Sequence, residues 1–300
     1  MSWLFFAFSG PVLWGISFHL DKYLIDRYFA HTDVAVLLVF SALIGLVMLP
    51  FILYYQPGVL ALPVGTVLLV AISGVLYLGA MLFYLQALKH EDASVVAPLF
   101  QATPLFAFGL GYLFLGEVLT PRQVAGGLAI VIGALVLSWE GRGVPFKARL
   151  VVLMLICTFT LAVASVIFKI FAIEEEFWPT TFWTYVGEAV FGLAILANPA
   201  YRAQFAALFR TQRAPLLVMN GVNELVNLAG GLGIRYALLL APLSLVQAIG
   251  STTSLFAFLF GVLFSLFVPS LGGTELSVAN LLRQSVGALL ITAGAVLVSV

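Results

Sequence analysis

Residues 84–133 read YLQALKHEDASVVAPLFQATPLFAFGLGYLFLGEVLTPRQVAGGLAIVIG. Two apolar segments, each long enough to cross a bilayer of about 30 Å, flank one short polar turn. The pattern returns later in the chain, because Leu105–Phe108 (LFAF) recurs 150 positions on as Leu255–Phe258. Four further residues, Gln123, Gly126, Gly133 and Ser138, recur at an offset of 161 as Gln284, Gly287, Gly294 and Ser299. The sequence therefore predicts an internal duplication with an insertion around Val268–Leu276.

The composition is that of a multi-pass membrane protein. Of 300 residues, 63% are hydrophobic and 9% are charged, whereas a soluble domain carries about 25% charged residues. Since a spanning helix needs about 20 mostly apolar residues, the chain divides into ten predicted spans. They are Trp3–Tyr23, Val34–Tyr55, Val64–Leu88, Ala93–Leu115, Pro121–Trp139, Leu150–Phe171, Thr180–Pro199, Pro215–Leu239, Pro242–Val268 and Leu281–Val298.

Several classes of function find no support in the sequence. The net charge is zero and no basic block occurs, which argues against nucleic acid as a partner. The single cysteine, Cys157, excludes an intramolecular disulfide. No metal-spaced set of His, Cys and Asp, no phosphate loop and no nucleophile elbow is present. We therefore expect no enzyme, no metal and no cofactor, and we expect a monomer or homodimer whose partners are the lipid bilayer and a small-molecule substrate.

The start of the predicted span at Pro121 has a clear local signal. Thr120 can cap the helix, Pro121 is tolerated at its first position, and Gln123 completes a capping box. We expect the helix to begin there.

The run from Ala87 to Gly133 resembles the EamA repeat of the drug/metabolite transporter superfamily. The matching features are Ala87-Leu88, Ala93-Ser94, Pro98, Pro104, Gly116-Glu117, Thr120, Gln123, Gly126 and Gly133, together with Trp14-Gly15. The resemblance implies an all-α integral membrane protein of ten transmembrane helices, arranged as two inverted five-helix repeats. These would be residues 1–139 and 150–300, joined by a linker at 140–149. The second copy replaces the Gly-Glu turn with VPSLGGTE, where Glu275 takes the place of Glu117.

The predicted span Pro215–Leu239 carries the sharpest polar signal. Asn220, Asn223, Glu224 and Asn227 fall at i, i+3, i+4 and i+7, so they share one helix face. In hydrocarbon such a face must look onto protein or a water-filled path. It could line a substrate cavity, or it could form a hydrogen-bonded seam between helices without a substrate role.

Other polar residues within the spans complete the set of candidate positions. Gln247 and Ser251 share a face, and Ser251 is the repeat counterpart of Gln101. The first span offers Trp14, Ser17 and Asp21 on one face, and Tyr84 lies in the last turns of the third span. We predict that substrate contacts come from Trp14, Ser17, Tyr84, Gln101, Asn220, Asn223, Asn227, Gln247 and Ser251.

Ionisable residues far from the span ends are expensive in a membrane and are functional candidates by default. Glu224 and Glu188 lie near the middle of their spans, and His19 belongs to the residue type most often used to carry protons at physiological pH. We predict that they couple protons to transport, with Glu224 first. Lys22 and Lys169 occupy matching depths in the two copies, which suits either an anchor at the membrane boundary or a functional role.

Together these features predict a secondary transporter in the plasma membrane, expected to be a bacterial inner membrane. It would export small polar metabolites, such as amino acids, by alternating access, and the resemblance implies this class of substrate. Two alternatives remain open at this stage. One is a flippase or transporter of a lipid-linked or nucleotide-linked sugar, and the other is a non-transporting membrane receptor or assembly factor.

Overall fold

The computed structural model describes residues 2–28, 32–90, 96, 99–138, 148–211, 213–267 and 278–299. Most of the predicted linker 140–149, the insertion at 268–276, Glu275, Pro98 and the Ala93-Ser94 pair lie outside these ranges. Within them the chain is all-helical, which confirms the predicted fold class at this level. The helices are α1 (Ser2–Tyr28), α2 (Ala35–Tyr55), η1 (Pro57–Ala61), α3 (Val64–His90), α5 (Ala102–Leu115), α6 (Pro121–Ser138), α7 (Ala148–Glu174), α8 (Phe177–Ala197), α9 (Pro199–Thr211), α10 (Arg213–Leu240), α11 (Leu243–Gly250), α12 (Thr253–Phe267) and α13 (Val278–Ser299).

Within the described ranges each predicted span lies on helical structure. In the span predicted at Ala93–Leu115, α5 begins only at Ala102, after a turn at Gln101. Two further differences occur. The span predicted at Pro242–Val268 is two helices, because the chain turns at Ser251 and Thr252 between α11 and α12. At this break the Thr252 N–H donates to the Ile249 carbonyl over three residues, which is the tighter 3₁₀ pattern. The second difference is α9, a short helix that the hydropathy of the chain does not predict, since it mixes apolar residues with Arg202 and Arg210.

Six stretches are long and apolar enough to cross a membrane: Trp3–Ile25, Ala35–Tyr55, Val64–Ala87, Ala148–Glu174, Phe177–Ala197 and Leu243–Phe267. Three shorter apolar helices accompany them: Ala102–Leu115, Pro121–Val136 and Ser285–Val298. The outward-facing side chains include many large apolar ones, such as Leu113, Phe114, Phe267 and Leu289, each more than 60% exposed. Because a soluble surface rarely shows contiguous apolar area on this scale, the chain is an integral, multi-pass membrane protein.

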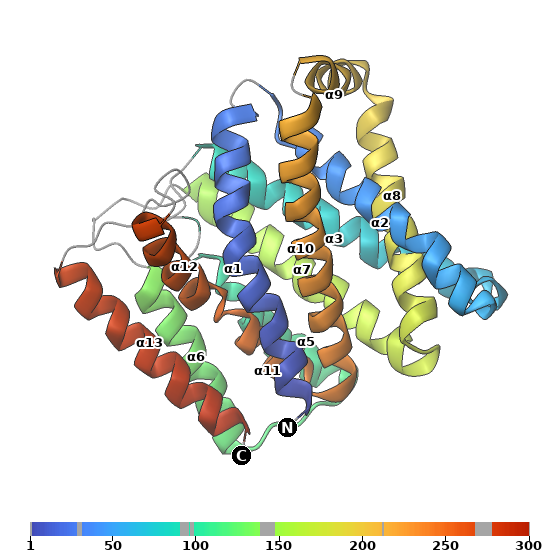
Figure 1. Cartoon of the computed structure of the whole chain (residues 1–300). Helices are drawn as coiled ribbons and strands as arrows, with labels where there is room; N and C mark the ends of the chain where they lie inside the picture. The colour runs from blue at the N-terminus through green and yellow to red at the C-terminus, as the bar shows by residue number, and fades with distance from the viewer. Residues whose placement is uncertain are drawn as a thin grey trace.

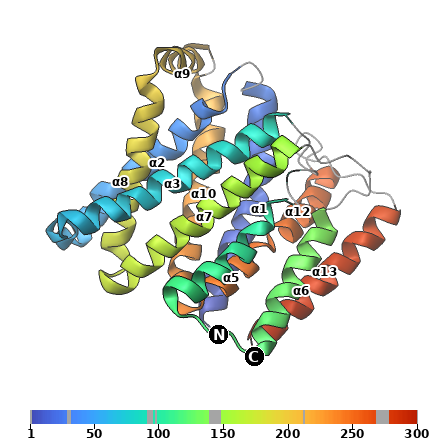
Figure 2. The same ribbon diagram turned by 180° about the vertical axis from the view of Figure 1, so that it is seen from behind.

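The helices form a bundle with a paired edge and a central pair (Figure 1). At the edge, α6 and α13 lie side by side, as the view from behind also shows (Figure 2). In the middle α1 packs along α10, and α2, α3 and α8 pack together on the other side. The short helix α9 lies across the end opposite to the one where α1 begins and α13 ends (Figure 1). The central pair α1–α10 therefore runs through the whole bundle and brings the polar face of α10 against α1.

The predicted start of α6 at Pro121 is confirmed. The N–H of Gln123 donates to Oγ1 of Thr120 at 3.3 Å, and the N–H of Thr120 donates to Oε1 of Gln123 at 3.0 Å. Each side chain thus satisfies a backbone donor that the first turn of a helix leaves free, which is the reciprocal arrangement of a capping box.

Candidate functional site

Asn223 of α10 joins this helix to α1 through two hydrogen bonds. The hydroxyl of Ser17 donates to Oδ1 of Asn223 at 2.6 Å, and Nδ2 of Asn223 donates to Oδ1 of Asp21 at 2.6 Å. Asn223 is fully buried, and Ser17 is buried as well. Because Ser17 and Asp21 are one turn apart, a single amide on the facing helix reaches both of them. The contact between α1 and α10 is thus polar at its centre.

Glu224 points to a different neighbour, because adjacent residues of a helix are turned by about 100° from each other. The hydroxyl of Ser41 in α2 donates to Oε1 of Glu224 at 2.8 Å. Glu224 is buried, with 5% of the residue exposed. Asn223 and Glu224 therefore place the polar face of α10 between α1 and α2.

Glu188 of α8 forms a buried ion pair with Arg235 of α10, with Oε1 and Nη2 2.5 Å apart. Three aromatic rings surround the guanidinium carbon, with centroids at 4.8 Å for Tyr185, 5.6 Å for Tyr77 and 5.7 Å for Phe168. Ring faces attract cations at this distance. The charge of Arg235 is thus neutralised by one carboxylate and enclosed by aromatic side chains from α3, α7 and α8.

These groups form one electrostatic cluster inside the bundle. Tyr77 of α3 interacts with Glu188, Arg235, Glu224 and Asp21, and Glu224 interacts with both other carboxyl groups. The cluster combines three carboxyl groups with one arginine. Only Glu188 has a cationic partner among the described side chains, since Asp21 and Glu224 meet neutral amide and hydroxyl groups.

The other two members of the polar face differ from each other. Asn220 is 2% exposed, and its Oδ1 has no hydrogen-bond partner among the residues that the structure describes. Asn227, one turn beyond Asn223, is half-buried. Since buried polar atoms are normally hydrogen-bonded, the orphan oxygen of Asn220 is the exceptional feature of this face.

A second polar group lies at the break between α11 and α12. Nε2 of Gln101 donates to Oγ of Ser254 at 3.1 Å, and Nε2 of Gln247 donates to Oγ of Ser165 at 2.9 Å. Ser251 is buried, and its hydroxyl has no partner within the described ranges. Gln101 also lines a cavity of about 150 Å³ with apolar neighbours. The structure thus gathers Gln101, Gln247 and Ser251 around one helix break.

The remaining predicted residues are divided between different helix faces. Tyr84 stacks edge-on against Phe100 at 5.2 Å and interacts electrostatically with Asp21, so it borders the carboxyl cluster. Trp14 packs against Gly230 of α10. His19 instead contacts α12: its Nε2 lies 2.8 Å from the carbonyl oxygen of Ala257, and its ring meets Phe264. The structure brings Ser17, Asn220, Asn223, Glu224 and Glu188 into one region, and His19 lies on another face of α1.

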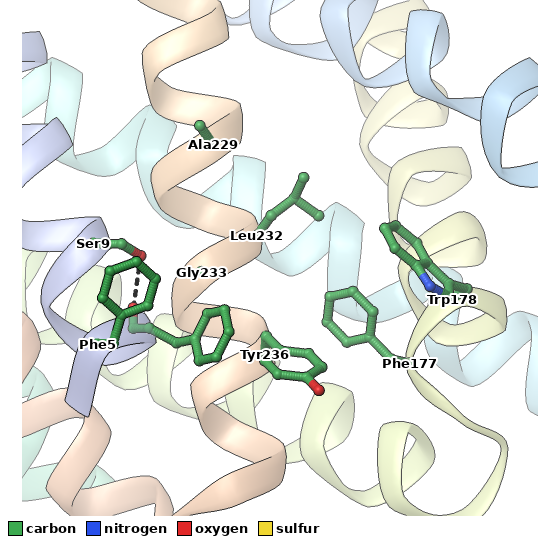
Figure 3. Close-up of a pocket in the computed structure, with 9 residues that line it drawn as sticks. Phe5, Ser9, Phe177, Trp178, Ala229, Leu232, Gly233 and Tyr236 are labelled. Carbon is green, nitrogen blue, oxygen red and sulfur yellow. Dashed lines mark hydrogen bonds between the residues drawn. The ribbon is translucent and has the colours of Figure 1, made fainter. Parts of the chain in front are cut away.

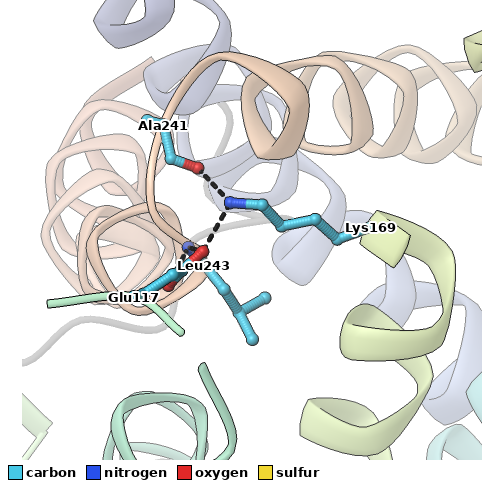
Figure 4. A network of polar contacts seen from close by, with 4 residues as sticks. All are labelled: Glu117, Lys169, Ala241 and Leu243. Atoms are coloured by element: carbon cyan, nitrogen blue, oxygen red, sulfur yellow. Dashed lines mark hydrogen bonds and ion pairs between the residues drawn. The ribbon is translucent and has the colours of Figure 1, made fainter. Parts of the chain in front are cut away.

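A further buried ion pair holds the turn between α5 and α6 (Figure 4). Gly116 ends α5 in the left-handed region, with φ of +62°, which glycine adopts without strain. The next residue, Glu117, then accepts from Lys169 Nζ at 2.6 Å and from the N–H of Leu243, at the start of α11, at 2.8 Å. Lys169 also donates to the carbonyl of Ala241 at 2.6 Å. The Gly116-Glu117 motif therefore connects α5, α7 and the junction between α10 and α11.

One cavity lies apart from all the predicted residues (Figure 3). It has a volume of about 400 Å³ and is bordered by α1, α8 and α10. Its lining is mostly aromatic and consists of Phe5, Phe6, Ser9, Phe177, Trp178, Ala229, Leu232, Gly233 and Tyr236. Sequence patterns did not reveal it, since single aromatic residues at helix ends are common in any membrane protein.

Comparison with known proteins supplies the family. Residues 1–139 match the model of the EamA-like transporter family. Over these residues the chain is similar to that family. The predicted EamA resemblance is thereby confirmed, and the family is one of membrane transporters rather than enzymes. No curated protein matches the chain.

A solved crystal structure shares the fold of the EamA-like chain. The two are similar over 99% of this chain and 96% of the other, with a TM-score of 0.70 and 18% sequence identity. At this identity the likeness concerns the fold alone. It extends the similarity beyond residues 1–139 to nearly the whole chain.

Some members of the site were not among the predicted site residues. Ser41 and Tyr77 are single polar groups in apolar helices, and nothing in the sequence places them opposite Glu224 or Arg235. Arg235 follows the polar face of α10 along the helix, and this continuation is the one signal that points to it. The pairing of Glu117 with Lys169 joins residues 52 positions apart, so no local pattern could show it.

Proposed function

We propose that the chain is a secondary transporter that exports small polar metabolites across the plasma membrane by alternating access. The observation that carries the proposal is the buried polar cluster of α1, α2, α8 and α10, which lies inside an otherwise apolar bundle. Charged groups are expensive in such a place and mark substrate or ion pathways in membrane proteins. The EamA-like match of residues 1–139 supports transport as the general activity.

Alternating access in this proposal comes from two inverted five-helix halves, 1–139 and 150–300. Support comes from the packing of the first helix of each half on helices of the other half. Helix α1 packs on α10 and α12, and its counterpart α7 packs on α3 and α5. The helix breaks agree with this, since Gln101 and Ser251 are repeat counterparts and each precedes a helix start by one or two residues. That α1 begins and α13 ends at the same end of the bundle fits an even number of crossings (Figure 1).

The glycines of α6 and α13 support the same two-fold relation. A Cβ added to Gly133 would lie 2.7 Å from the carbonyl oxygen of Gly287, and one added to Gly294 would lie 2.6 Å from that of Gly126. Gly126 and Gly287 are repeat counterparts, as are Gly133 and Gly294. A two-fold axis between the helices converts the first contact into the second. In this proposal the paired edge lies on the axis between the halves.

Proton coupling is assigned to Glu224 in this scheme. Its partner Ser41 is neutral, so the carboxyl group can change its protonation state without breaking an ion pair. Glu188 is already paired with Arg235, and His19 faces α12, so both are weaker candidates. The seam interpretation accounts for Asn223, whose amide is satisfied by α1, but it does not account for Asn220.

The test is transport by purified protein in proteoliposomes. We expect uptake or efflux of at least one compound, from a panel of radiolabelled amino acids and other polar metabolites, to respond to an imposed proton gradient. Glu224→Gln should remove that response, while Glu174→Gln, at an exposed position near the end of α7, should keep it. Wild-type rates and wild-type pH dependence in Glu224→Gln would end the assignment.

A further inference from the structure

We propose that the carboxyl cluster between α1, α2 and α10 is the binding site for an organic cation, with Asp21, Glu224 and Asn220 as its ligands. This rests on the proposed transport function and narrows its substrate class to compounds that carry an ammonium or a similar positive group.

The first argument is the balance of charge. Glu224 interacts with both Asp21 and Glu188, and Arg235 is the cation that the described residues bring to these carboxyl groups. Arg235 is committed to Glu188 at 2.5 Å. Lys169, the other buried cation, is bound to Glu117 and to the Ala241 carbonyl. Two carboxyl groups thus lack a cationic partner among the described side chains, and a buried carboxylate without one is destabilised unless it takes up a proton or a cation binds beside it.

The second argument is the orphan oxygen of Asn220. Its Oδ1 is buried and accepts nothing from the described residues, although an amide oxygen has two lone pairs. By helical geometry Asn220 lies one turn from both Asn223 and Glu224, and its direction falls between theirs. Asn223 points to α1 and Glu224 to α2. Asn220 is therefore directed into the space between the two unpaired carboxyl groups.

The site offers several hydrogen-bond acceptors. Three of the nearby donors are already engaged: the Ser17 hydroxyl with Asn223, the Ser41 hydroxyl with Glu224, and the Asn223 amide with Asp21. An ammonium group brings three N–H donors and a positive charge. An anionic ligand would add negative charge to a cluster that already has an excess of it.

The cation expected here is organic rather than a metal ion. Among the described residues, no group of three or more His, Cys, Asp or Glu side chains has an arrangement that could hold a metal. An organic cation also suits the aromatic side chains at the border of the cluster, since Tyr77 interacts with all three carboxyl groups and Tyr84 with Asp21. Ring faces add to the attraction for such a group.

The site is closed in this structure, as Asn220, Asn223 and Glu224 are each at most 5% exposed. A ligand can reach it only when α10 separates from α1 or α2. Binding should therefore stabilise one closed arrangement, and this can be measured by thermal unfolding of the full chain in lipid nanodiscs.

The experiment uses four probes with a common five-carbon chain: cadaverine, 5-aminopentanoate, glutarate and pentane-1,5-diol. We expect cadaverine to raise the unfolding midpoint in a saturable manner, and glutarate and the diol to leave it unchanged. Asp21→Asn and Glu224→Gln should each weaken the apparent affinity for cadaverine at least tenfold, and Glu174→Gln should retain it. Asn220→Ala, which removes a polar atom without a partner, should fold normally and bind cadaverine several-fold more weakly.

Equal stabilisation by glutarate or the diol, no stabilisation by any of the four probes, or wild-type affinity in the variants would each overturn the cation site. Transport assays distinguish failure of the cation site from failure of the proposed transport function. A protein that binds cadaverine but moves no compound in proteoliposomes refutes transport and leaves the site in place. A protein that moves only anionic or neutral compounds refutes the cation site and leaves transport in place.

Discussion

The ion pair between Glu188 and Arg235 allows the sharpest prediction about stability. Its side chains are 6% and 13% exposed, so neither charge can return to solvent when its partner is removed. Removing one partner of a buried pair costs about 3–5 kcal/mol, because the other charge stays buried without compensation. Replacing both partners by neutral groups of similar size is often close to neutral.

Because aromatic rings surround Arg235, the substitutions Glu188→Gln and Arg235→Met should lower the stability by different amounts. In Glu188→Gln the guanidinium keeps the ring faces of Tyr185, Tyr77 and Phe168, each worth about 0.5–2 kcal/mol. We therefore expect Glu188→Gln to lose about 3 kcal/mol of stability, the lower end of the range for a broken buried pair. Arg235→Met loses the rings as well as the charge pair, and it leaves Glu188 alone, so a loss of about 5 kcal/mol is expected.

The assay is a double-mutant cycle followed by helical circular dichroism during denaturant unfolding in detergent micelles. Glu188→Gln combined with Arg235→Met should be no less stable than Arg235→Met alone, which corresponds to a coupling energy of about 3 kcal/mol or more. The control is Glu176→Gln, whose partner Gln56 is exposed, with an expected change of less than about 0.5 kcal/mol. If the losses in the double variant are additive, with a coupling energy below about 0.5 kcal/mol, the idea that Glu188 and Arg235 neutralise each other is refuted.

Two further predictions concern contacts between residues 1–139 and residues 150–300. Gly133→Ala should lower stability by about 1–3 kcal/mol, because the new Cβ meets the backbone of α13 at 2.7 Å. The control is Gly109→Ala, which has nothing within 4 Å of its new Cβ and should be neutral or stabilising. Equal effects of the two variants in thermal unfolding would contradict the close packing of α6 on α13. Lys169→Met should cost about 3 kcal/mol, since it leaves Glu117 buried without its cation, whereas Lys22→Met, at the exposed counterpart position, should change stability by less than about 0.5 kcal/mol. Similar losses in the two lysine variants, by denaturant unfolding, would show that the ion pair contributes nothing.

Much of the architecture could be predicted from local sequence. The spans follow from hydropathy because a bilayer requires about 20 apolar residues per helix, and the start of α6 follows from the Thr120–Gln123 capping box, which involves neighbours only. The break between α11 and α12 was not predicted. Its residues are apolar or small on both sides, so hydropathy runs through it without a change.

The polar face of α10 was predicted as a unit because its residues repeat at helical spacing. Which of them are satisfied depended on partners from other helices. Asn223 meets Ser17 and Asp21, more than 200 positions away, Glu224 meets Ser41, and Asn220 meets no described partner through its oxygen. Spacing can place side chains on one face but carries no information about the groups opposite.

The Tyr84–Gly133 stretch shows both what the sequence determines and what it leaves to the tertiary structure. By itself the sequence determined the capped helix and the small residues of α6, and it predicted a repeat, because each of these rests on local chemistry or on comparison of the chain with itself. Only the tertiary structure decided the role of Glu117, which closes on Lys169 and on the N-terminus of α11 (Figure 4). It also decided that two carboxyl groups lie near each other with a single, already paired arginine. Charge balance inside a membrane is a property of neighbours in space, and the folded bundle alone sets them.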